Sequence, residues 1–303
     1  MIDKLIKSIE LKQNPTVVGL DPTYEIIPSF IKNEMLETYG KTPKAVAEMF
    51  LKFNKEIIDE TFELVPAVKP QVAMYEKYGL EGIRAYIETC EYAKEKGLLV
   101  IGDIKRGDIA STAAAYASHI EGTHIEGEFF DLWNEDAVTI NPYMGYDGIE
   151  PFLNACKNMN KGIFVLVKTS NPSSSEIQDL TVDGTPIYKI SASLVNKWGE
   201  SSIGNCGYSN VGAVVGATHK AIGTELRAYM PNTFFLVPGY GAQGGTGKDL
   251  VNYFDKNGGG AIINSSRGII GAYQKDLSNE KDFAKASRQA VIEMRDDLQK
   301  GGN

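Results

Sequence analysis

The stretch LLVIGDIKRGDIAST, residues 98–112, joins an apolar strand to a cluster of charges. Its first four residues are all large and apolar, which is typical of a parallel strand covered on both faces. Asp103, Lys105 and Asp108 follow this strand, and Thr112 lies one helical turn beyond Asp108. Because charges at the end of an apolar strand are costly unless each is paired, we expect the chain to use this cluster chemically.

Further apolar runs of the same kind occur along the chain, with helical patterns between them. Together with 98–103, the runs are 16–21, 65–69, 137–141, 163–168, 211–216, 233–238 and 261–264. Amphipathic helical patterns cover 43–63, 80–96, 147–157, 186–198, 219–230, 247–256 and 281–298. Eight strands alternating with helices in 303 residues predict an α/β fold, a (β/α)8 TIM barrel. We expect a single domain over residues 1–303, with insertions at 22–42 and 122–135.

An open, doubly wound sheet is the alternative fold, because it also alternates strands with helices. Such sheets often carry a Gly-x-Gly-x-x-Gly loop after the first strand, where the loop binds a dinucleotide. Here the first strand is followed by Asp21-Pro22-Thr23, which lacks that loop. The sequence therefore favours the barrel.

Composition excludes several classes of protein. The net charge is −8 and basic residues are interleaved with acids, so no basic stripe for nucleic acid is present. The 3 cysteines are widely spaced and indicate neither a disulfide framework nor a zinc site, and no metal cofactor is expected. The amphipathic N-terminus MIDKLIKSIELKQNP lacks the apolar core of a signal peptide, and no run is long enough to span a membrane. We therefore expect a cytoplasmic protein.

Polar or charged residues end several of the predicted strands. In a barrel these ends share the C-terminal face, where barrel enzymes place their chemistry. A single such residue could merely mark where a strand leaves the core, but Asp or Lys at four strand ends favours a site. The residues are Asp21, Lys69, Asp103 with Lys105, Asn141, Lys168 and Asn264.

Asp103 and Lys105 stand at positions i and i+2, which on a regular strand point to the same face. With Asp108 beyond Gly107, Lys105 has a carboxylate on either side in the sequence. An ammonium held in this way suits proton donation to a carbanion or stabilisation of a developing negative charge. The alternative is a structural network of ion pairs at a strand end.

The glycine-rich segment FFLVPGYGAQGGTG, residues 234–247, follows the seventh predicted strand, and Arg267-Gly268 follows the eighth. Loops at these two positions are the usual phosphate site of a barrel. Their backbone N–H groups can hold an oxyanion, and Arg267 can add a bidentate contact. A polar loop after the fifth strand, residues 168–175, could bind the edge of a heterocycle or form a simple turn.

These residues resemble the orotidine 5′-phosphate decarboxylase family. Asp103-Ile104-Lys105-Arg106-Gly107-Asp108 with Thr112 is similar to the family's Asp-x-Lys-x-x-Asp motif. Gly19-Leu20-Asp21-Pro22 and Val68-Lys69-Pro70-Gln71 resemble its first two strands. Ser170 falls where the family has the serine that touches the pyrimidine, and Pro238, Gln243, Arg267 and Gly268 resemble its phosphate-binding end. The resemblance covers the whole chain and is greatest for the longer subgroup of the family.

The resemblance implies decarboxylation of orotidine 5′-phosphate to uridine 5′-phosphate, the last step of de novo pyrimidine biosynthesis, without metal or organic cofactor. Lys105 is then expected to stabilise and protonate C6, and Asp103 to face the substrate carboxylate. The resemblance also implies that Lys69 holds the acid network and that Asp21 binds the ribose. Asp108 and Thr112 are expected to reach the active site of a neighbouring subunit, which implies a homodimer.

Three other functions remain open from the sequence. A sugar-phosphate decarboxylase or synthase of the same superfamily carries the same motif but uses Mg²⁺, and Lys69 argues against a metal at its position. A Schiff-base aldolase could use Lys168 or Lys69. A phosphate-binding barrel without catalysis would bind uridine 5′-phosphate and release no CO₂.

Overall fold

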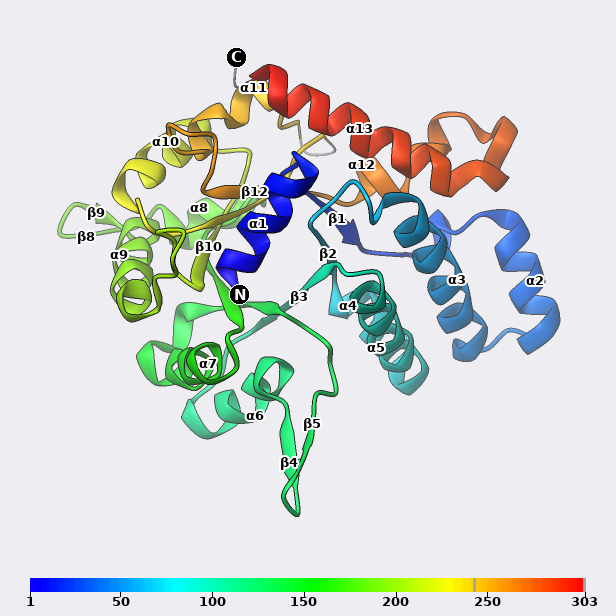
Figure 1. The fold of residues 1–303 in the computed structure, drawn as a ribbon, viewed down its shortest axis with the longest axis horizontal. Coiled ribbons are helices and arrows are strands. Elements are labelled where there is room, and N and C mark those ends of the chain that lie inside the picture. Colours follow the sequence, from blue (N-terminus) through cyan, green and yellow to red (C-terminus); the bar gives the residue numbers. More distant parts are fainter. Residues whose placement is uncertain (242–243, 302–303) are drawn as a thin grey trace.

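The computed structural model describes residues 1–241 and 244–301 of the chain. Eight parallel strands form a closed barrel in the order β1-β12-β11-β10-β7-β6-β3-β2 (Figure 1). Each strand overlaps one of the predicted apolar runs, so the TIM barrel is confirmed and the open sheet is excluded, although β3 extends three residues beyond its predicted end. The strands are β1 Thr16–Leu20, β2 Ala67–Pro70, β3 Leu99–Arg106, β6 Ala137–Ile140, β7 Gly162–Lys168, β10 Val211–Val215, β11 Phe235–Pro238 and β12 Ala261–Ser265.

Helices surround the barrel, and most of them lie where the apolar periodicity predicts. None of those described is both long and apolar enough to cross a lipid bilayer. Their bounds are α1 Ile2–Lys12, α2 Ser29–Tyr39, α3 Pro43–Thr61, α4 Val72–Glu76, α5 Gly79–Glu95, α6 Ala110–Glu121, α7 Tyr146–Met159, α8 Ser175–Gln178, α9 Ile187–Gly199, α10 Lys220–Tyr229, α11 Gly247–Leu250, α12 Arg267–Ile270 and α13 Phe283–Gly301.

The predicted helix over 247–256 is wrong in length, because α11 ends at Leu250 and a 3-10 turn, Val251–Tyr253, follows it. The carboxylate of Asp255 accepts the backbone N–H groups of Asn257 and Gly259 at 2.7 and 2.9 Å. Aspartate often forms a turn by bonding to nearby backbone in this way. That turn replaces the end of the predicted helix.

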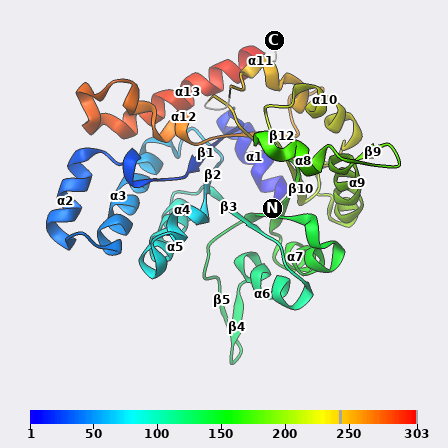
Figure 2. The ribbon, with the colours of Figure 1, turned by 180° about the vertical axis from the view of Figure 1, so that it is seen from behind.

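Both predicted insertions carry secondary structure of their own. Residues 22–42 contain the 3-10 turn Tyr24–Ile26 and α2, which packs on α3. Residues 122–135 contain an antiparallel hairpin of β4, Thr123–Ile125, and β5, Glu128–Phe130. Figures 1 and 2 show this hairpin projecting away from the barrel beside α6. A second short hairpin, β8 Thr181–Val182 with β9 Thr185–Pro186, precedes α9.

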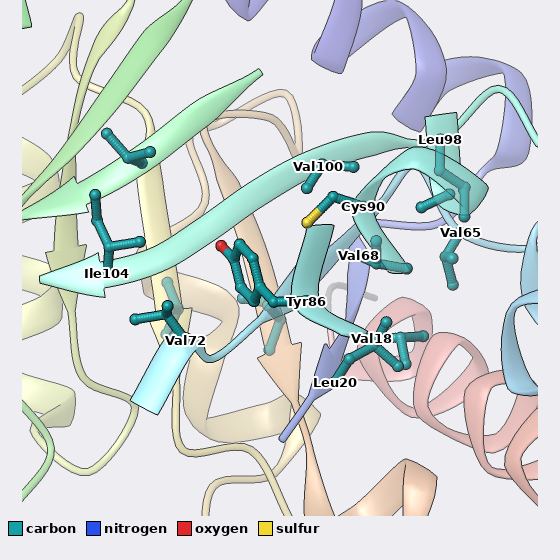
Figure 3. Packing of buried hydrophobic residues seen from close by; sticks show 14 of the residues in the cluster. Val18, Leu20, Val65, Val68, Val72, Tyr86, Cys90, Leu98, Val100 and Ile104 are labelled. Carbon is teal, nitrogen blue, oxygen red and sulfur yellow. The ribbon is translucent and has the colours of Figure 1, made fainter. Parts of the chain in front are cut away.

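Two layers of apolar side chains form the core, because successive residues of a strand point to opposite faces of the sheet. The inner layer fills the barrel and includes Met1, Ile2 and Leu5, so α1 closes its N-terminal end. The outer layer lies between strands and helices, and Figure 3 shows part of it around β2, β3 and α5. In five strands the residues that point into the barrel change from apolar to polar towards its C-terminal mouth. The polar residues that point into the barrel there are Asp21, Lys69, Asp103, Thr139 and Asn264.

Candidate active site

The carboxylate of Asp103 lies at the barrel mouth between two lysines. Lys69 Nζ is 2.5 Å from its Oδ2, and Lys105 Nζ contacts its Oδ1. Gln71 Nε2 also donates to Oδ2 at 3.0 Å, and Thr139 Oγ1 donates to Oδ1 at 2.8 Å. The side chain of Lys105 is 44% exposed, whereas that of Asp103 is only 8% exposed. The buried carboxylate is therefore fully bonded, and Lys105 remains open to a ligand.

The neighbouring charges set the ionisation of this cluster. Burial alone would raise the pKa of Asp103, but the charges of Lys69 and Lys105 hold that pKa well below its usual range. Burial alone would lower the pKa of Lys69, but Asp103 and Asp21 raise it above its usual value. Asp21 Oδ1 lies 4.0 Å from Lys69 Nζ, at the edge of the same cluster. Near neutral pH the site therefore contains an ionised Asp103 and a protonated Lys69.

A bulge in β3 places Lys105. Between Gly102 and Arg106 this strand advances four residues, while the paired segment Val138 to Ile140 of β6 advances two. Lys105 has φ of 45°, in the left-handed region, so the segment is not the regular strand on which the i, i+2 expectation was based. The two side chains still meet, because the bulge turns Lys105 towards the mouth.

Two buried acceptors at the mouth have no hydrogen-bond partner within residues 1–241 and 244–301. They are Asp21 Oδ1 and Asn264 Oδ1, at the ends of neighbouring strands β1 and β12. The two strands approach closely there, since a Cβ atom on Gly19 would lie 1.9 Å from Ser266 Oγ. A buried acceptor without a donor is costly, so a ligand carrying hydroxyl groups would be bound favourably here.

The predicted phosphate-binding residues follow β11 and β12. Pro238 ends β11, and Arg267 and Gly268 begin α12. Arg267 is exposed, and within the described part of the chain its guanidinium has neither an ion pair nor a hydrogen bond. Tyr240, in the glycine-rich loop, is tied to the C-terminal helix by a 2.8 Å hydrogen bond from its hydroxyl to Asp297. Gln243 lies outside the described residues.

The other predicted site residues lie apart from the Asp103 cluster. Asp108 Oδ1 accepts the backbone N–H of Ile109 at 2.8 Å, so within one chain Lys105 is bonded to Asp103 and not to Asp108. Thr112 is half-buried in the first turns of α6. Ser170 follows β7, where its backbone lies against Gly216 at the end of β10.

Two further strand-end residues do not join the cluster. Lys168 is fully buried, with its Nζ 2.6 Å from Asp179 and 5.7 Å from the centre of the Tyr188 ring. Asn141 Oδ1 accepts the backbone N–H of Tyr143 at 3.0 Å, which is the role of a turn residue. Among the residues that the structure describes, no group of three or more His, Cys, Asp or Glu side chains could hold a metal ion.

Known proteins that are similar to this chain identify its family. The model of the "Orotidine 5'-phosphate decarboxylase / HUMPS family" matches residues 15–281. The chain belongs to this family. The orotidine 5′-phosphate decarboxylase of Clostridium tetani is 45% identical over 299 residues, which cover 98% of this chain and 97% of the relative. The predicted family and the predicted enzyme class are therefore confirmed.

Two more members of the decarboxylase family support this assignment. The orotidine 5′-phosphate decarboxylase of Clostridium kluyveri is 44% identical over 301 residues, covering 99% of this chain and 97% of that protein. The solved structure of Leishmania donovani OMP decarboxylase has a TM-score of 0.71 and 31% sequence identity, and it covers 97% of this chain and 98% of its own. Sequence and fold thus agree along nearly the full length.

Thr139 and Gln71 both contact Asp103, although no role is predicted for either from the sequence. Strand alternation could have found Thr139, because Ala137 lies in the inner layer and Thr139 is two residues further along β6. Gln71 continues the inner face of β2 beyond Lys69 in the same way, and it forms an isolated bridge with Asp103. The predicted barrel already makes these strands neighbours, and the missing information was their register and the bulge in β3.

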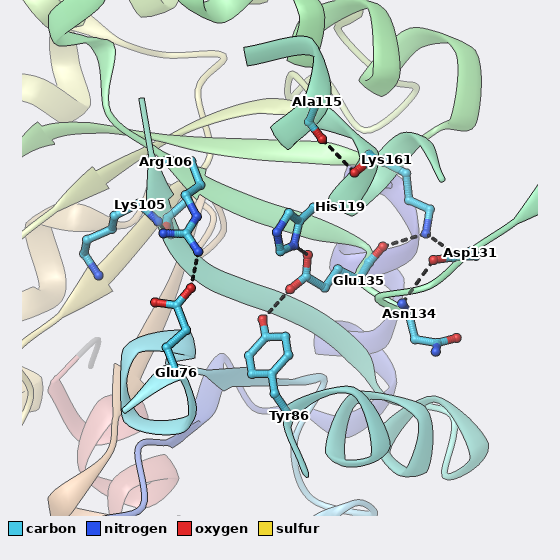
Figure 4. A network of polar contacts seen from close by, with 12 residues as sticks. Glu76, Tyr86, Lys105, Arg106, Ala115, His119, Asp131, Asn134, Glu135 and Lys161 are labelled. Atoms are coloured by element: carbon cyan, nitrogen blue, oxygen red, sulfur yellow. Dashed lines mark hydrogen bonds and ion pairs between the residues drawn. The ribbon is translucent and has the colours of Figure 1, made fainter. Parts of the chain in front are cut away.

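A second polar cluster lies on the outer side of β3 (Figure 4). Glu135 is fully buried, accepts a hydrogen bond from the Tyr86 hydroxyl and lies 2.8 Å from His119 Nδ1. His119 in turn stacks on Trp133, with ring centres 4.0 Å apart. Burial raises the pKa of Glu135, and the hydrogen bond and charge of His119 oppose that shift. The cluster connects α5 and α6 behind the strand that carries Asp103.

Proposed function

We propose that the chain decarboxylates orotidine 5′-phosphate to uridine 5′-phosphate and CO₂, the last step of UMP biosynthesis. The match over residues 15–281 and the names of relatives about 45% identical support this activity. The observation that carries the proposal is the contact between Lys105 Nζ and the ionised Asp103 at the open end of the barrel. It supplies a positioned proton donor beside a fixed negative charge.

In the proposed reaction, the bond between C6 and the carboxylate carbon breaks and its electron pair remains on C6. The carboxylate leaves as CO₂. The ammonium group of Lys105 stabilises the carbanion and then transfers a proton to C6, which gives uridine 5′-phosphate. Lys105 regains a proton from solvent, to which its side chain is open. The residues supply this chemistry without a metal or an organic cofactor.

Asp103 has two roles in this proposal. It orients Lys105, and it faces the substrate carboxylate. Two carboxylates about 4 Å apart repel by about 4 kcal/mol at an effective dielectric constant of about 20. Enzymes commonly lower barriers by about 8–23 kcal/mol, so this repulsion alone cannot account for the effect. Stabilisation of the carbanion by Lys105 is the larger contribution.

Binding of the rest of the nucleotide is assigned to other residues around the mouth, most of them at the ends of β1, β11 and β12. Asp21, whose buried Oδ1 accepts no hydrogen bond within the described residues, is proposed to accept hydrogen bonds from ribose hydroxyls. Arg267, Gly268, Pro238 and Gln243 are proposed to bind the phosphate, and Ser170 the pyrimidine. Arg267 suits this role because it is exposed and unpaired within the described residues. Binding energy from the phosphate can then be used at C6.

The proposal includes a homodimer, in which Asp108 and Thr112 complete the site of the neighbouring subunit. Asp108 lies outside the Asp103 cluster of its own chain, and its neighbour Ile109 is an exposed apolar residue. Tyr143, Met144 and Tyr146 add further exposed apolar surface after β6. Such a surface favours association. A single domain over 1–303 and a cytoplasmic location remain predictions from the sequence.

The experiment is a spectrophotometric assay of the purified chain with orotidine 5′-phosphate, with and without a chelator. We expect loss of substrate absorbance, release of CO₂ and no effect of the chelator. Activity that disappears with the chelator would favour the Mg²⁺-dependent relatives, and binding of uridine 5′-phosphate without turnover would favour the non-catalytic barrel. The aldolase alternative is disfavoured because the ammonium groups of Lys69 and Lys168 are each paired with a carboxylate.

A further inference from the structure

We infer that Thr139 is a positioning residue of the proposed decarboxylase site, where its hydroxyl fixes Asp103 and Lys105 relative to each other. The inference rests on the proposed function, because it assigns the reaction to those two side chains. Thr139 itself is 1% exposed and lies on β6, next to β3 in the barrel. It acts through its neighbours, and we assign it no contact with the substrate.

The hydroxyl of Thr139 both donates and accepts a hydrogen bond. Oγ1 donates to Asp103 Oδ1 at 2.8 Å and accepts the backbone N–H of Lys105 at 3.1 Å. Asp103 Oδ1 is also the oxygen that Lys105 Nζ contacts. One hydroxyl therefore holds the backbone of the lysine and the carboxylate oxygen to which its ammonium is bonded.

The bulge of β3 explains why a side chain, and not the backbone of β6, bonds to the N–H of Lys105. Regular pairing between β3 and β6 stops after Gly102 and resumes at Arg106. Within the bulge, the Lys105 N–H is bonded to Thr139 Oγ1 in place of a carbonyl oxygen of the neighbouring strand. Lys105 also has a positive φ, which costs free energy for a residue with a side chain. The bond to Thr139 stabilises that conformation.

A small displacement of Lys105 would affect the chemistry more than the binding. Proton transfer requires Nζ to lie within hydrogen-bond reach of C6, and a displacement of about 1 Å can lower a rate about a hundred-fold. The proposed phosphate and ribose contacts come from β1, β11 and β12, on the other side of the barrel from β6. Loss of the Thr139 hydroxyl should therefore reduce kcat and leave KM and the affinity for uridine 5′-phosphate largely unchanged.

The test compares three variants of the full chain. Thr139→Val replaces the hydroxyl by a methyl group of similar shape, and we expect kcat to fall by about a hundred-fold. Thr139→Ser keeps the hydroxyl and should restore kcat to within about three-fold of the unmodified enzyme. Thr16→Val is the matched control, because Thr16 is a buried strand threonine whose Oγ1 has no hydrogen-bond partner within the described residues. It should leave kcat unchanged.

Unchanged kcat in Thr139→Val would overturn the inference. A similar loss of kcat in Thr139→Ser or in Thr16→Val would also overturn it, because the missing hydroxyl at position 139 would then not be the cause of the fall in kcat. A loss shared equally between KM and kcat would also contradict it. Absence of turnover in the unmodified chain would refute the proposed function instead. In that case crystal structures of the variants still test whether Thr139 positions Lys105. Lys105 should leave the left-handed conformation in Thr139→Val and keep it in Thr139→Ser.

Discussion

The carboxylate of Glu135 lies directly against Gly102, the residue before Asp103 on β3. A Cβ atom at position 102 would lie 2.1 Å from Glu135 Oε1 and 2.4 Å from its Cδ. Glu135 is fully buried and is bonded to both Tyr86 and His119, so it has little freedom to withdraw. Glycine is therefore required at position 102 because of the close approach of this acid.

Gly102→Ala should accordingly destabilise the fold by about 1–3 kcal/mol, the usual cost of forcing extra atoms into a packed interior. Denaturant unfolding measures this free energy, and kcat should fall as well because Asp103 is the next residue. A double-mutant cycle with Glu135→Ala provides the control. Gly102→Ala should cost much less in that background, and an equal cost in both backgrounds would show that Glu135 is not the obstacle.

Glu135→Gln should change how stability depends on pH. Burial raises the pKa of Glu135 in the folded chain above its unfolded value, so between the two values the folded state binds more protons. The free energy of unfolding therefore falls as pH rises through that window, by up to about 1.4 kcal/mol per pH unit. Glutamine does not titrate, so the stability of the variant relative to the unmodified chain should increase as pH rises above about 4.5.

Denaturant unfolding at a series of pH values provides the measurement for this prediction. Glu128→Gln, on the exposed hairpin β4–β5, corrects for the change in net charge. A relative stability of Glu135→Gln that decreases with rising pH would contradict the prediction.

The sequence predicts the barrel well, because each strand is an apolar run covered on both faces and this pattern depends on local residues alone. It also places Asp21, Lys69, Asp103 and Asn264 at one end, since the polar residues follow those runs. The predicted length of α11 is wrong, because of an interaction between residues that are close in the sequence. There the side chain of Asp255 forms a turn with its own backbone, which apolar periodicity does not register.

The arrangement within the site is harder to predict, because it depends on the register between neighbouring strands and on the bulge in β3. The spacing of Asp103 and Lys105 indicates a shared face, but the contact forms through a bulge that is defined only against β6. Thr139 stabilises this bulge, although it lies 34 residues from Lys105 in the sequence. The pair of Lys69 with Asp103 is easier to predict, because β2 and β3 are consecutive strands and are therefore adjacent in the predicted barrel.

Arg267→Ala should weaken uridine 5′-phosphate about 10–100-fold, because a charged hydrogen-bonding partner of the phosphate is lost. Affinity for uridine should change little, since the nucleoside has no phosphate. Titration calorimetry with both ligands gives the comparison. Arg295→Ala, which removes an arginine paired with Asp296 on α13, is the control and should affect neither ligand. Equal weakening of both ligands by Arg267→Ala would show that this residue does not contact the phosphate.

Lys105→Ala and Asp108→Ala should each abolish most of the decarboxylation, by at least about a hundred-fold, and leave binding of uridine 5′-phosphate largely intact. If Asp108 serves the partner's site, a dimer containing one chain of each kind has one complete site. Random assembly of equal amounts then restores about a quarter of the activity of the unmodified enzyme. Co-expression of the two variants with different affinity tags yields the mixed dimer for assay.

A matched pair distinguishes this rescue from a general effect of mixing. Asp103 and Lys105 are proposed to serve the same site of their own chain, so a mixed dimer of Asp103→Ala with Lys105→Ala has no complete site. It should remain inactive. Rescue only in the mixed dimer of Asp108→Ala with Lys105→Ala would support a site shared between subunits. Only in that dimer do both substitutions fall in one active site and leave the second active site intact. Failure of both pairs, with mixed dimers recovered by both tags, would place Asp108 in the site of its own chain.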